Sequence, residues 1–252
     1  MQNPNAKGNS GFLWGVGVLL VIIAVVIAYI VFTQKDAKSD KIAESAVDVT
    51  LTVSRGDDGV VTLKGENAKA DVPEVDLYED FSCPHCAELA EGSDEPMKQA
   101  VEKGELIVNV HPLNFLDLRG QDLDAYLADK SIKLDGHSST SVSALDILAE
   151  AGDAQAYWNL RAYLFENQQT ISTWDFEQFA EAAKGFGASD DSVKAISKAT
   201  VDAGNDIGRA NAKKLKEETG SVSSPRVIQD GKDLEKPEDV PVNEWNWVEQ
   251  VL

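Results

Sequence analysis

The sequence predicts an α/β domain that carries an α-helical insertion and follows a transmembrane helix. Three observations predict this class: an uncharged apolar run near the N-terminus, strand patterns on both sides of a Cys-x-x-Cys motif, and about 100 residues of helical spacing before the pattern returns to strand. The chain has 252 residues, of which 43% are hydrophobic and 26% charged, so it is too apolar for general disorder.

The apolar run covers residues 11–32, GFLWGVGVLLVIIAVVIAYIVF, and contains no charged side chain. This length is sufficient to span a bilayer as a helix, and the TQKD that follows offers no cleavage site for a signal peptide. We therefore expect a short tail at 1–10, a transmembrane anchor at 11–32 and a polar linker at 33–46.

The strand patterns begin directly after the linker. Residues 46–64, AVDVTLTVSRGDDGVVTLK, alternate between apolar and polar side chains on both sides of a glycine-containing turn, which predicts a β-hairpin. Two further strands are predicted over 73–80, PEVDLYED, and over 105–111, ELIVNVH.

A helix is predicted between these two strands, in CPHCAELAEGSDEPMKQAVEKG. It starts near Cys83, has Pro84 in its first turn and ends at Gly104. Pro96 is expected to kink or interrupt it, because proline lacks the N–H that an interior helix position needs.

Residues 121–218 show helical spacing of large apolar side chains and almost no strand pattern. Asp190 is the expected cap of a long final helix that reaches Thr219. After it, GSVSSPRVIQDG predicts a strand and a turn, and NEWNWVEQVL predicts a closing amphipathic helix. Strands, then helices, then a strand again predict a first α/β segment at 47–117, an α-helical insertion at 118–204 and a second α/β segment at 205–252.

The formal net charge is −20, and an acidic surface repels the phosphate backbone, which argues against nucleic-acid binding. The chain has two cysteines, Cys83 and Cys86, only three positions apart. Secreted domains that are held together by disulfides use more cysteines at wider spacing. We therefore interpret the pair as reactive cysteines rather than as part of a disulfide framework that holds the domain together.

Three interpretations compete for the tetrapeptide CPHC at residues 83–86: a zinc half-site, a structural disulfide and a redox-active dithiol. A structural zinc site needs four ligands, usually with a second pair at short spacing, whereas His111 and His137 are far apart. A disulfide across so short a loop removes little chain entropy. The redox dithiol is favoured, with no metal and no cofactor other than the Cys83–Cys86 disulfide.

A Cys-x-x-Cys at the start of a helix places its first sulfur near unpaired backbone N–H groups and the positive end of the helix dipole, which favour a thiolate. His85 favours the thiolate further as a donor or a cation, so Pro84 and His85 are the expected tuning residues. Cys83 is the expected exposed nucleophile, and Cys86 resolves the mixed disulfide. Because a stabilised thiolate makes the disulfide less stable, the pair is expected to oxidise other proteins.

These residues resemble the DsbA-like branch of the thioredoxin superfamily. YEDFSCPHC is similar to the strand end and Cys-Pro-His-Cys of that family, and GSVSSPRVIQDG is similar to the segment that carries its cis-proline. The resemblance covers about Val47 to Leu252. It implies a thioredoxin-like fold with an inserted α-helical domain, a cis-proline at Pro225, and substrate binding by the loop of Ser224 and Pro225.

The sequence departs from the family pattern at two places. Many relatives have Val or Thr before the cis-proline, where this chain has Ser224. The buried acid that some relatives carry six positions before the first cysteine is matched here by Leu77. Asp76, Glu79 and Asp80 lie nearby, and the sequence does not choose among them as the proton acceptor.

The N-terminal anchor, in place of a cleaved signal, is similar to that of membrane-anchored actinobacterial enzymes of the MdbA type. This resemblance implies substrates among secreted or surface proteins with reduced cysteines, including pilins. It also implies a membrane reoxidase that resembles vitamin K epoxide reductase.

The leading hypothesis is a membrane-anchored thiol–disulfide oxidoreductase, a protein dithiol oxidase, that donates disulfides to secreted or cell-surface proteins. Two alternatives stay open: a disulfide reductase or isomerase of the same fold, and a non-catalytic anchored binding protein with a thioredoxin-like domain. A monomer is favoured, because isomerases of this kind dimerise through an added domain and only the short hairpin could serve as one.

The proposed chemistry predicts on which side of the membrane the catalytic domain lies. Lys7 precedes the anchor and Lys35, Lys38 and Lys41 follow it, so the flanking charges lean weakly toward a cytoplasmic domain. Protein oxidation needs an oxidising compartment. We therefore expect a single-pass cell-membrane protein whose catalytic domain is extracytoplasmic.

Overall fold

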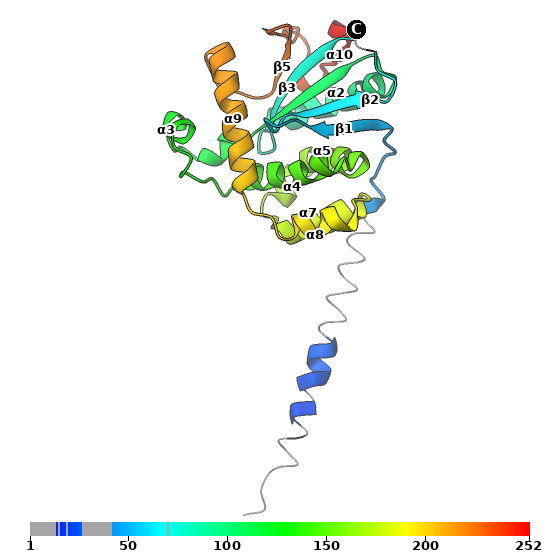
Figure 1. Ribbon diagram of the computed structural model, residues 1–252, viewed down its shortest axis with the longest axis vertical. Helices are drawn as coiled ribbons and strands as arrows, with labels where there is room; N and C mark the ends of the chain where they lie inside the picture. The colour runs from blue at the N-terminus through cyan, green and yellow to red at the C-terminus, as the bar shows by residue number, and fades with distance from the viewer. Residues whose placement is uncertain (1–13, 15, 19, 27–41, 70) are drawn as a thin grey trace, which may run out of the picture.

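The computed structural model of the chain describes residues 14, 16–18, 20–26, 42–69 and 71–252 (Figure 1). Its centre is a six-stranded sheet in the order β1-β2-β4-β3-β5-β6. The strands are β1 (Leu51–Arg55), β2 (Val61–Gly65), β3 (Glu74–Asp80), β4 (Ile107–Leu113), β5 (Arg226–Gln229) and β6 (Lys232–Asp233).

The central strand β3 pairs in parallel with β4 and antiparallel with β5. The predicted hairpin is confirmed, since β1 pairs antiparallel with β2, which then extends the sheet beside β4. The strand starts at Leu51, later than the alternation suggests. Val47 and Val49 instead give their backbone N–H groups to the side chains of Asn159 and Gln155.

The chain between β3 and β4 forms one long helix, and the chain between β4 and β5 forms the helical insertion. The helices are α2 (Pro84–Glu102), η1 (Phe115–Leu118), α3 (Leu123–Ala128), α4 (His137–Ala151), α5 (Ala154–Glu166), α6 (Gln168–Ile171), α7 (Phe176–Gly185), α8 (Asp190–Ile196), α9 (Asp202–Thr219), η2 (Val242–Glu244) and α10 (Val248–Val251). The α/β fold with a helical insertion agrees with the prediction.

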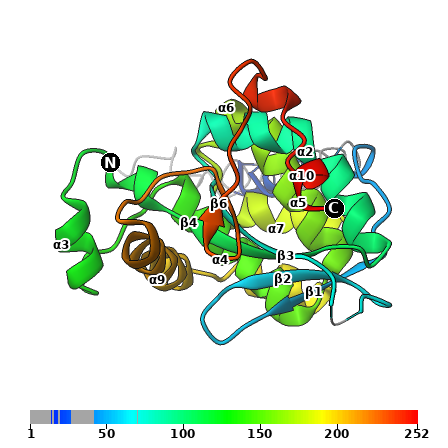
Figure 2. The ribbon, with the colours of Figure 1, turned by 90° about the horizontal axis from the view of Figure 1, so that it is seen from above.

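Two faces of the sheet are covered by different helices (Figures 1 and 2). On one face Val75 and Leu77 of β3 belong to the main core, which α2, α4 and α5 complete. On the other face Tyr78 packs with Ile228 and with Leu215 of α9. Successive residues of β3 therefore point into two different layers, as the period of two in a strand requires.

The helix after the Cys-x-x-Cys is not interrupted at Pro96, contrary to the sequence prediction. α2 continues to Glu102, and Met97 and Val101 beyond the proline are fully buried. Burial of this apolar face keeps the chain helical although one backbone hydrogen bond is missing. Gly104 follows with a φ of 72° and ends the helix, as predicted.

The predicted single helix from Asp190 to Thr219 is two helices, α8 and α9. The chain leaves α8 at Ser197, whose hydroxyl bonds to the Lys194 carbonyl. Such local bonds from serine and threonine compete with the helix ladder. The cap of α8 is Ser189, and the predicted domain boundary between 204 and 205 falls inside α9.

The C-terminal segment is also less helical than its pattern predicts. Only the short η2 and α10 form, and Trp245 and Trp247 are buried between them. Burial of both indole rings, rather than one apolar helix face, determines the path of the chain here.

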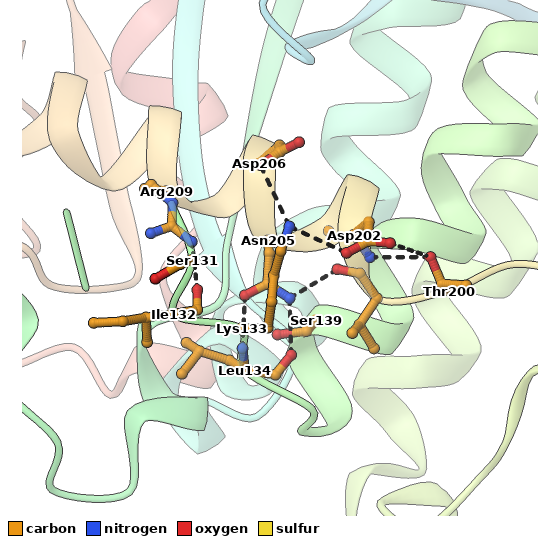
Figure 3. A network of polar contacts seen from close by, with 12 residues as sticks. Ser131, Ile132, Lys133, Leu134, Ser139, Thr200, Asp202, Asn205, Asp206 and Arg209 are labelled. Carbon is orange, nitrogen blue, oxygen red and sulfur yellow. Dashed lines mark hydrogen bonds and ion pairs between the residues drawn. The ribbon is translucent and has the colours of Figure 1, made fainter. Parts of the chain in front are cut away.

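A buried polar network fastens the loop between α3 and α4 to α9 (Figure 3). The Arg209 guanidinium donates to the carbonyls of Asp129 and Ile132 and lies 4.0 Å from the centre of the Tyr126 ring. The Asn205 amide exchanges two hydrogen bonds of 2.8 Å with the backbone of Leu134. These contacts fix the entry into α4, whose first turn reaches the candidate active site.

The predicted N-terminal tail at 1–10 lies outside the described residues, as do half of the anchor at 11–32 and most of the linker at 33–46. The described positions of the anchor are helical, and Trp14 and Leu20 among them are exposed. In the part of the chain that the structure describes, no helix is both long and apolar enough to cross a membrane. Ile42, assigned to the linker, is buried in the main core.

Candidate active site

The Cys-Pro-His-Cys tetrapeptide lies where β3 ends and α2 begins. Phe81 and Ser82 form the turn, and the Cys83 N–H donates to the Asp80 carbonyl at 2.9 Å. Cys83 is the N-cap of α2, with extended backbone angles, and Pro84 occupies the first helical position. Proline suits this position because its fixed φ matches the helix and no partner exists for an N–H there.

The Cys83 sulfur lies between the start of α2 and the Ser224–Pro225 loop. Its thiol is 3.5 Å from the Ser224 carbonyl oxygen. A hydrogen bond from the Cys86 thiol, together with the Ser224 side chain and the first N–H groups of α2, lowers the pKa of Cys83 to about 5 against the effect of burial. At neutral pH the reduced site therefore carries a thiolate at Cys83.

Cys86 has the opposite character. It is buried in the core one turn into α2, and the Asp80 backbone N–H approaches its sulfur at 3.5 Å. Burial and the neighbouring Cys83 thiolate raise the pKa of Cys86 well above its usual value. Cys86 therefore holds its proton more strongly than Cys83 does.

The predicted exposure of Cys83 is wrong. Cys83 is only 6% exposed, compared with 3% for Cys86. The Ser224–Pro225 loop, which is distant in sequence, approaches the sulfur from the C-terminal part of the chain. Access to Cys83 is therefore restricted on the side of this loop.

His85 points away from the protein, toward solvent. Its Nδ1 atom is 2.9 Å from a carboxylate oxygen of Glu88 on the next turn of α2. The hydrogen bond with Glu88 raises the pKa of His85. A protonated imidazole one residue after the start of α2 adds positive charge on the side of the Cys83 thiolate.

The peptide bond between Ser224 and Pro225 is cis. Pro225 also lies near Cys86, beside Glu79, Asp94 and Arg161, in a region too tightly packed to hold a water molecule. The structure thus brings together all six residues that the sequence predicts for the site, although Cys86 and Ser224 are separated by the whole insertion.

Glu79 is the buried acid on the Cys86 side of β3. Arg161 of α5 holds it with two hydrogen bonds, of 2.8 and 2.7 Å, and binds Asp94 of α2 at 2.8 Å. Burial raises the pKa of both carboxyl groups, against the attraction of the guanidinium. One oxygen of Asp94 is buried without a hydrogen-bond partner in this arrangement.

Asp80 is buried on the opposite side of β3. Its carboxylate accepts hydrogen bonds from the Ser138 hydroxyl and from the backbone N–H groups of Ser82 and Leu116. Burial raises the pKa of Asp80 to about 7, although these three bonds favour the carboxylate. Asp76, the third acid considered from the sequence, instead pairs with His111 on β4 at 2.7 Å.

A further contact was not predicted from the sequence. Gln168, the first residue of α6 in the insertion, donates its side-chain amide to the carbonyl oxygens of Phe81 at 3.0 Å and Cys83 at 2.9 Å. A single glutamine in a helical segment gives no sequence signal for such a contact, because its partners are more than 80 positions away. Among the described residues, no group of three or more His, Cys, Asp and Glu side chains is arranged to hold a metal ion.

Comparison with known proteins agrees with this architecture. The family described as Thioredoxin matches residues 65–242. A similar solved structure is the MdbA protein of Corynebacterium diphtheriae, a thiol-disulfide oxidoreductase, with 40% identity over 84% of this chain and 100% of that chain, and a TM-score of 0.69. No curated protein sequence matches the chain.

Two further MdbA structures are similar. The protein of Corynebacterium matruchotii, also described as a thiol-disulfide oxidoreductase, is 33% identical, covering 86% of this chain and 100% of that chain, with a TM-score of 0.73. The protein of Actinomyces oris is 20% identical over 71% of this chain and 81% of that chain, with a TM-score of 0.52, which shows a shared fold.

Proposed function

The chain belongs to the thioredoxin family and is a DsbA-like thiol–disulfide oxidoreductase of the actinobacterial MdbA type; on this premise we propose that it donates disulfides to secreted or surface proteins from a membrane anchor. The proposal goes beyond the family in three respects: the direction of the reaction, the site residues and the location.

The difference in pKa between the two cysteines supports the proposed direction of the reaction. Cys83 has a pKa of about 5 and Cys86 a pKa well above its usual value. A stabilised Cys83 thiolate favours the reduced form of the enzyme, so the oxidised form gives up its disulfide readily. This supports oxidation of substrates rather than their reduction.

The reaction transfers one disulfide in two steps. A substrate thiolate attacks Cys83 Sγ of the oxidised enzyme; a new S–S bond forms, the Cys83–Cys86 bond breaks, and Cys86 leaves as a thiolate and takes up a proton. A second substrate thiolate then attacks the substrate sulfur of this mixed disulfide and expels Cys83 as the thiolate. The substrate has lost two electrons, and the enzyme dithiol has gained them.

The surrounding residues have separate roles in this proposal. Ser224 and Pro225 present backbone to the substrate beside the Cys83 sulfur, where the Ser224 carbonyl already lies 3.5 Å away. Pro84 starts the helix that stabilises the leaving Cys83 thiolate. His85, when it is protonated, adds positive charge on the same side of α2.

Refolding of a reduced, inactive protein with several cysteines tests the function. The oxidised wild-type enzyme is expected to restore the activity of that protein, and Cys83→Ala is expected to restore none beyond the rate without enzyme. Cys86→Ala cannot form the Cys83–Cys86 disulfide, so it should not restore activity either. Its Cys83 thiolate should instead be trapped as a mixed disulfide when it attacks a substrate that already holds a disulfide, because no Cys86 thiol is present to break that bond. Equal refolding with wild type and Cys83→Ala would contradict the proposal.

The anchor and the location form a separate part of the proposal. Residues 11–32 carry no charge and are long enough to span a bilayer, and protein oxidation requires a compartment outside the cytoplasm. After reduction of intact cells, a membrane-impermeant thiol reagent should label Cys83. Labelling only after lysis would place the domain in the cytoplasm.

The proposed partners come from the resemblance to MdbA-type enzymes. Substrates are secreted or surface proteins, pilins among them, that arrive with reduced cysteines. A membrane reoxidase resembling vitamin K epoxide reductase takes the two electrons from the Cys83–Cys86 dithiol and restores the disulfide.

A further inference from the structure

The turn that presents Cys83 is held from the helical insertion. At the junction between α5 and α6, the Phe165 ring stacks on the Phe81 ring at 4.9 Å between centroids. Three residues later, the Gln168 amide donates to the carbonyls of Phe81 and Cys83. The same short segment of the insertion thus meets the active-site turn through an apolar and a polar contact.

The hydrogen bond to Cys83 is the shorter of the two. Its acceptor, the Cys83 carbonyl, already accepts hydrogen bonds from the first turn of α2. The Cys83 carbonyl also accepts from the N–H of Cys86 at 3.1 Å and from the N–H of Ala87 at 3.3 Å, as the first acceptor of α2. The bond from Gln168, at 2.9 Å, is the shortest of the three. The amide therefore acts on the peptide group that connects Cys83 to the helix.

Contacts of the neighbouring residues hold the backbone that carries Gln168 in place. α6 begins after Asn167, whose amide bonds back to the Tyr163 carbonyl of α5, and its last residue, Ile171, is buried in the main core. An amide on an anchored backbone loses little additional freedom when it makes two hydrogen bonds. A surface glutamine on a mobile loop would not give this advantage.

We propose that Gln168 is a positioning residue of the enzyme: its amide fixes the Cys83 backbone from the helical insertion and thereby holds the Cys83 sulfur opposite the Ser224 carbonyl. This inference rests on the proposed function, which it deepens by assigning a role to the insertion. The insertion then contributes directly to the reactivity of Cys83, in addition to covering the core.

Two physical effects follow from these hydrogen bonds. The first is geometric, since a fixed carbonyl keeps Cys83 in the extended N-cap conformation that aims its sulfur at the N–H groups of His85 and Cys86. The second is electrostatic, because the amide donor offsets the negative end of the Cys83 carbonyl dipole next to the thiolate. Loss of the donor should weaken the thiolate through both effects.

The test replaces Gln168 by methionine, which has a similar length and no hydrogen-bond donor, and uses Gln169→Met as the matched control. Gln169 is the exposed neighbour in the same helix. The full chain in detergent is reduced, and the Cys83 thiolate is titrated by its ultraviolet absorbance and by its rate of alkylation. Gln168→Met should raise the pKa of Cys83 and lower kcat/KM for substrate oxidation about fivefold, whereas Gln169→Met should match wild type.

Gln168→Glu is the second variant, because it keeps the side-chain length and places an acceptor against both carbonyls. It should raise the pKa of Cys83 further than Gln168→Met does. An unchanged Cys83 pKa in both Gln168 variants, with wild type active in refolding, would overturn the positioning role and leave the proposed function in place. A wild-type enzyme that does not oxidise substrate would overturn the proposed function, while the thiolate titration would still decide the role of Gln168.

Discussion

Glu79 and Asp80 are consecutive residues of β3, and both are buried, yet the protein stabilises them in different ways. Glu79 faces the layer of α2 and α5, where the guanidinium of Arg161 binds it through both oxygens. Asp80 lies at the end of β3, where its partners are the Ser138 hydroxyl in the first turn of α4 and two backbone N–H groups. One acid is paired with a charge and the other only with neutral donors.

This difference in partners determines how each acid responds to mutation and to pH. A buried carboxylate beside a buried guanidinium depends on that partner, because removal of one charge leaves the other without compensation. A buried carboxylate with neutral donors can gain a proton instead, because no opposite charge prevents neutralisation. We therefore expect Glu79 to be sensitive to mutation of its partner and Asp80 to be sensitive to pH.

The largest expected effect comes from Arg161→Met, which leaves Glu79 and Asp94 buried without their shared cation. The free energy of unfolding should fall by about 3–5 kcal/mol, as for other broken buried ion pairs. Urea denaturation at pH 7 measures the loss. Lys216→Met is the control: Lys216 pairs with Asp124 at the surface, where the two side chains are 38% and 73% exposed, so its loss should stay within about 1 kcal/mol. Equal losses in the two variants would contradict the comparison.

The next effect is the pH dependence that Asp80 gives to stability. Its pKa is about 7 in the folded protein and about 3.9 in an unfolded chain, so between these values the folded state binds one more proton. Stability should therefore fall as the pH rises from 4 to 7 and level off above, by at most about 4 kcal/mol from this group.

Asp80→Asn removes that titration. Urea denaturation of the oxidised protein, in which neither cysteine titrates, should show a smaller loss of stability between pH 5 and pH 8 in Asp80→Asn than in wild type. Glu79→Gln provides the comparison across β3, and its pH dependence should stay closer to wild type because Arg161 opposes protonation of Glu79. If Asp80→Asn keeps the wild-type pH dependence, Asp80 is not the titrating group.

The smallest effect is expected from Ser138→Ala, which removes the hydroxyl donor of Asp80. The loss should be about 1 kcal/mol at pH 8, where Asp80 is a carboxylate, and smaller at pH 5, where it is protonated. Ser141→Ala, one turn further along α4 and equally buried, is the control and should show no such difference between the two pH values. A larger loss at pH 5 than at pH 8 for Ser138→Ala would contradict the assigned role of the hydroxyl.

Sequence patterns were sufficient for the parts of the fold and site that depend on neighbouring residues. The hairpin, the strand before Cys83 and the helix after it follow from local alternation, from Pro84 and from Gly104. The placement of Cys83 at the start of α2 also follows locally, whereas the burial of Cys86 and the contact of Cys83 with Ser224 depend on the tertiary structure.

The rest depends on contacts across long stretches of chain. Alternation along β3 places Glu79 and Asp80 on opposite faces, but only the tertiary structure shows that Arg161 lies on one side and Ser138 on the other. The continuous helix through Pro96 and the break after Ile196 are decided by burial and by local serine bonds, which the apolar pattern does not report.

The 141 positions between Cys83 and Ser224 also have a consequence during biosynthesis. At a typical elongation rate, the ribosome completes Ser224 on the order of ten seconds after Cys83. Throughout that interval the nascent dithiol lacks the loop that faces its sulfur, so Cys83 is open on a side that the folded enzyme closes. The restricted access to Cys83 is therefore complete only after the last part of the chain has been made.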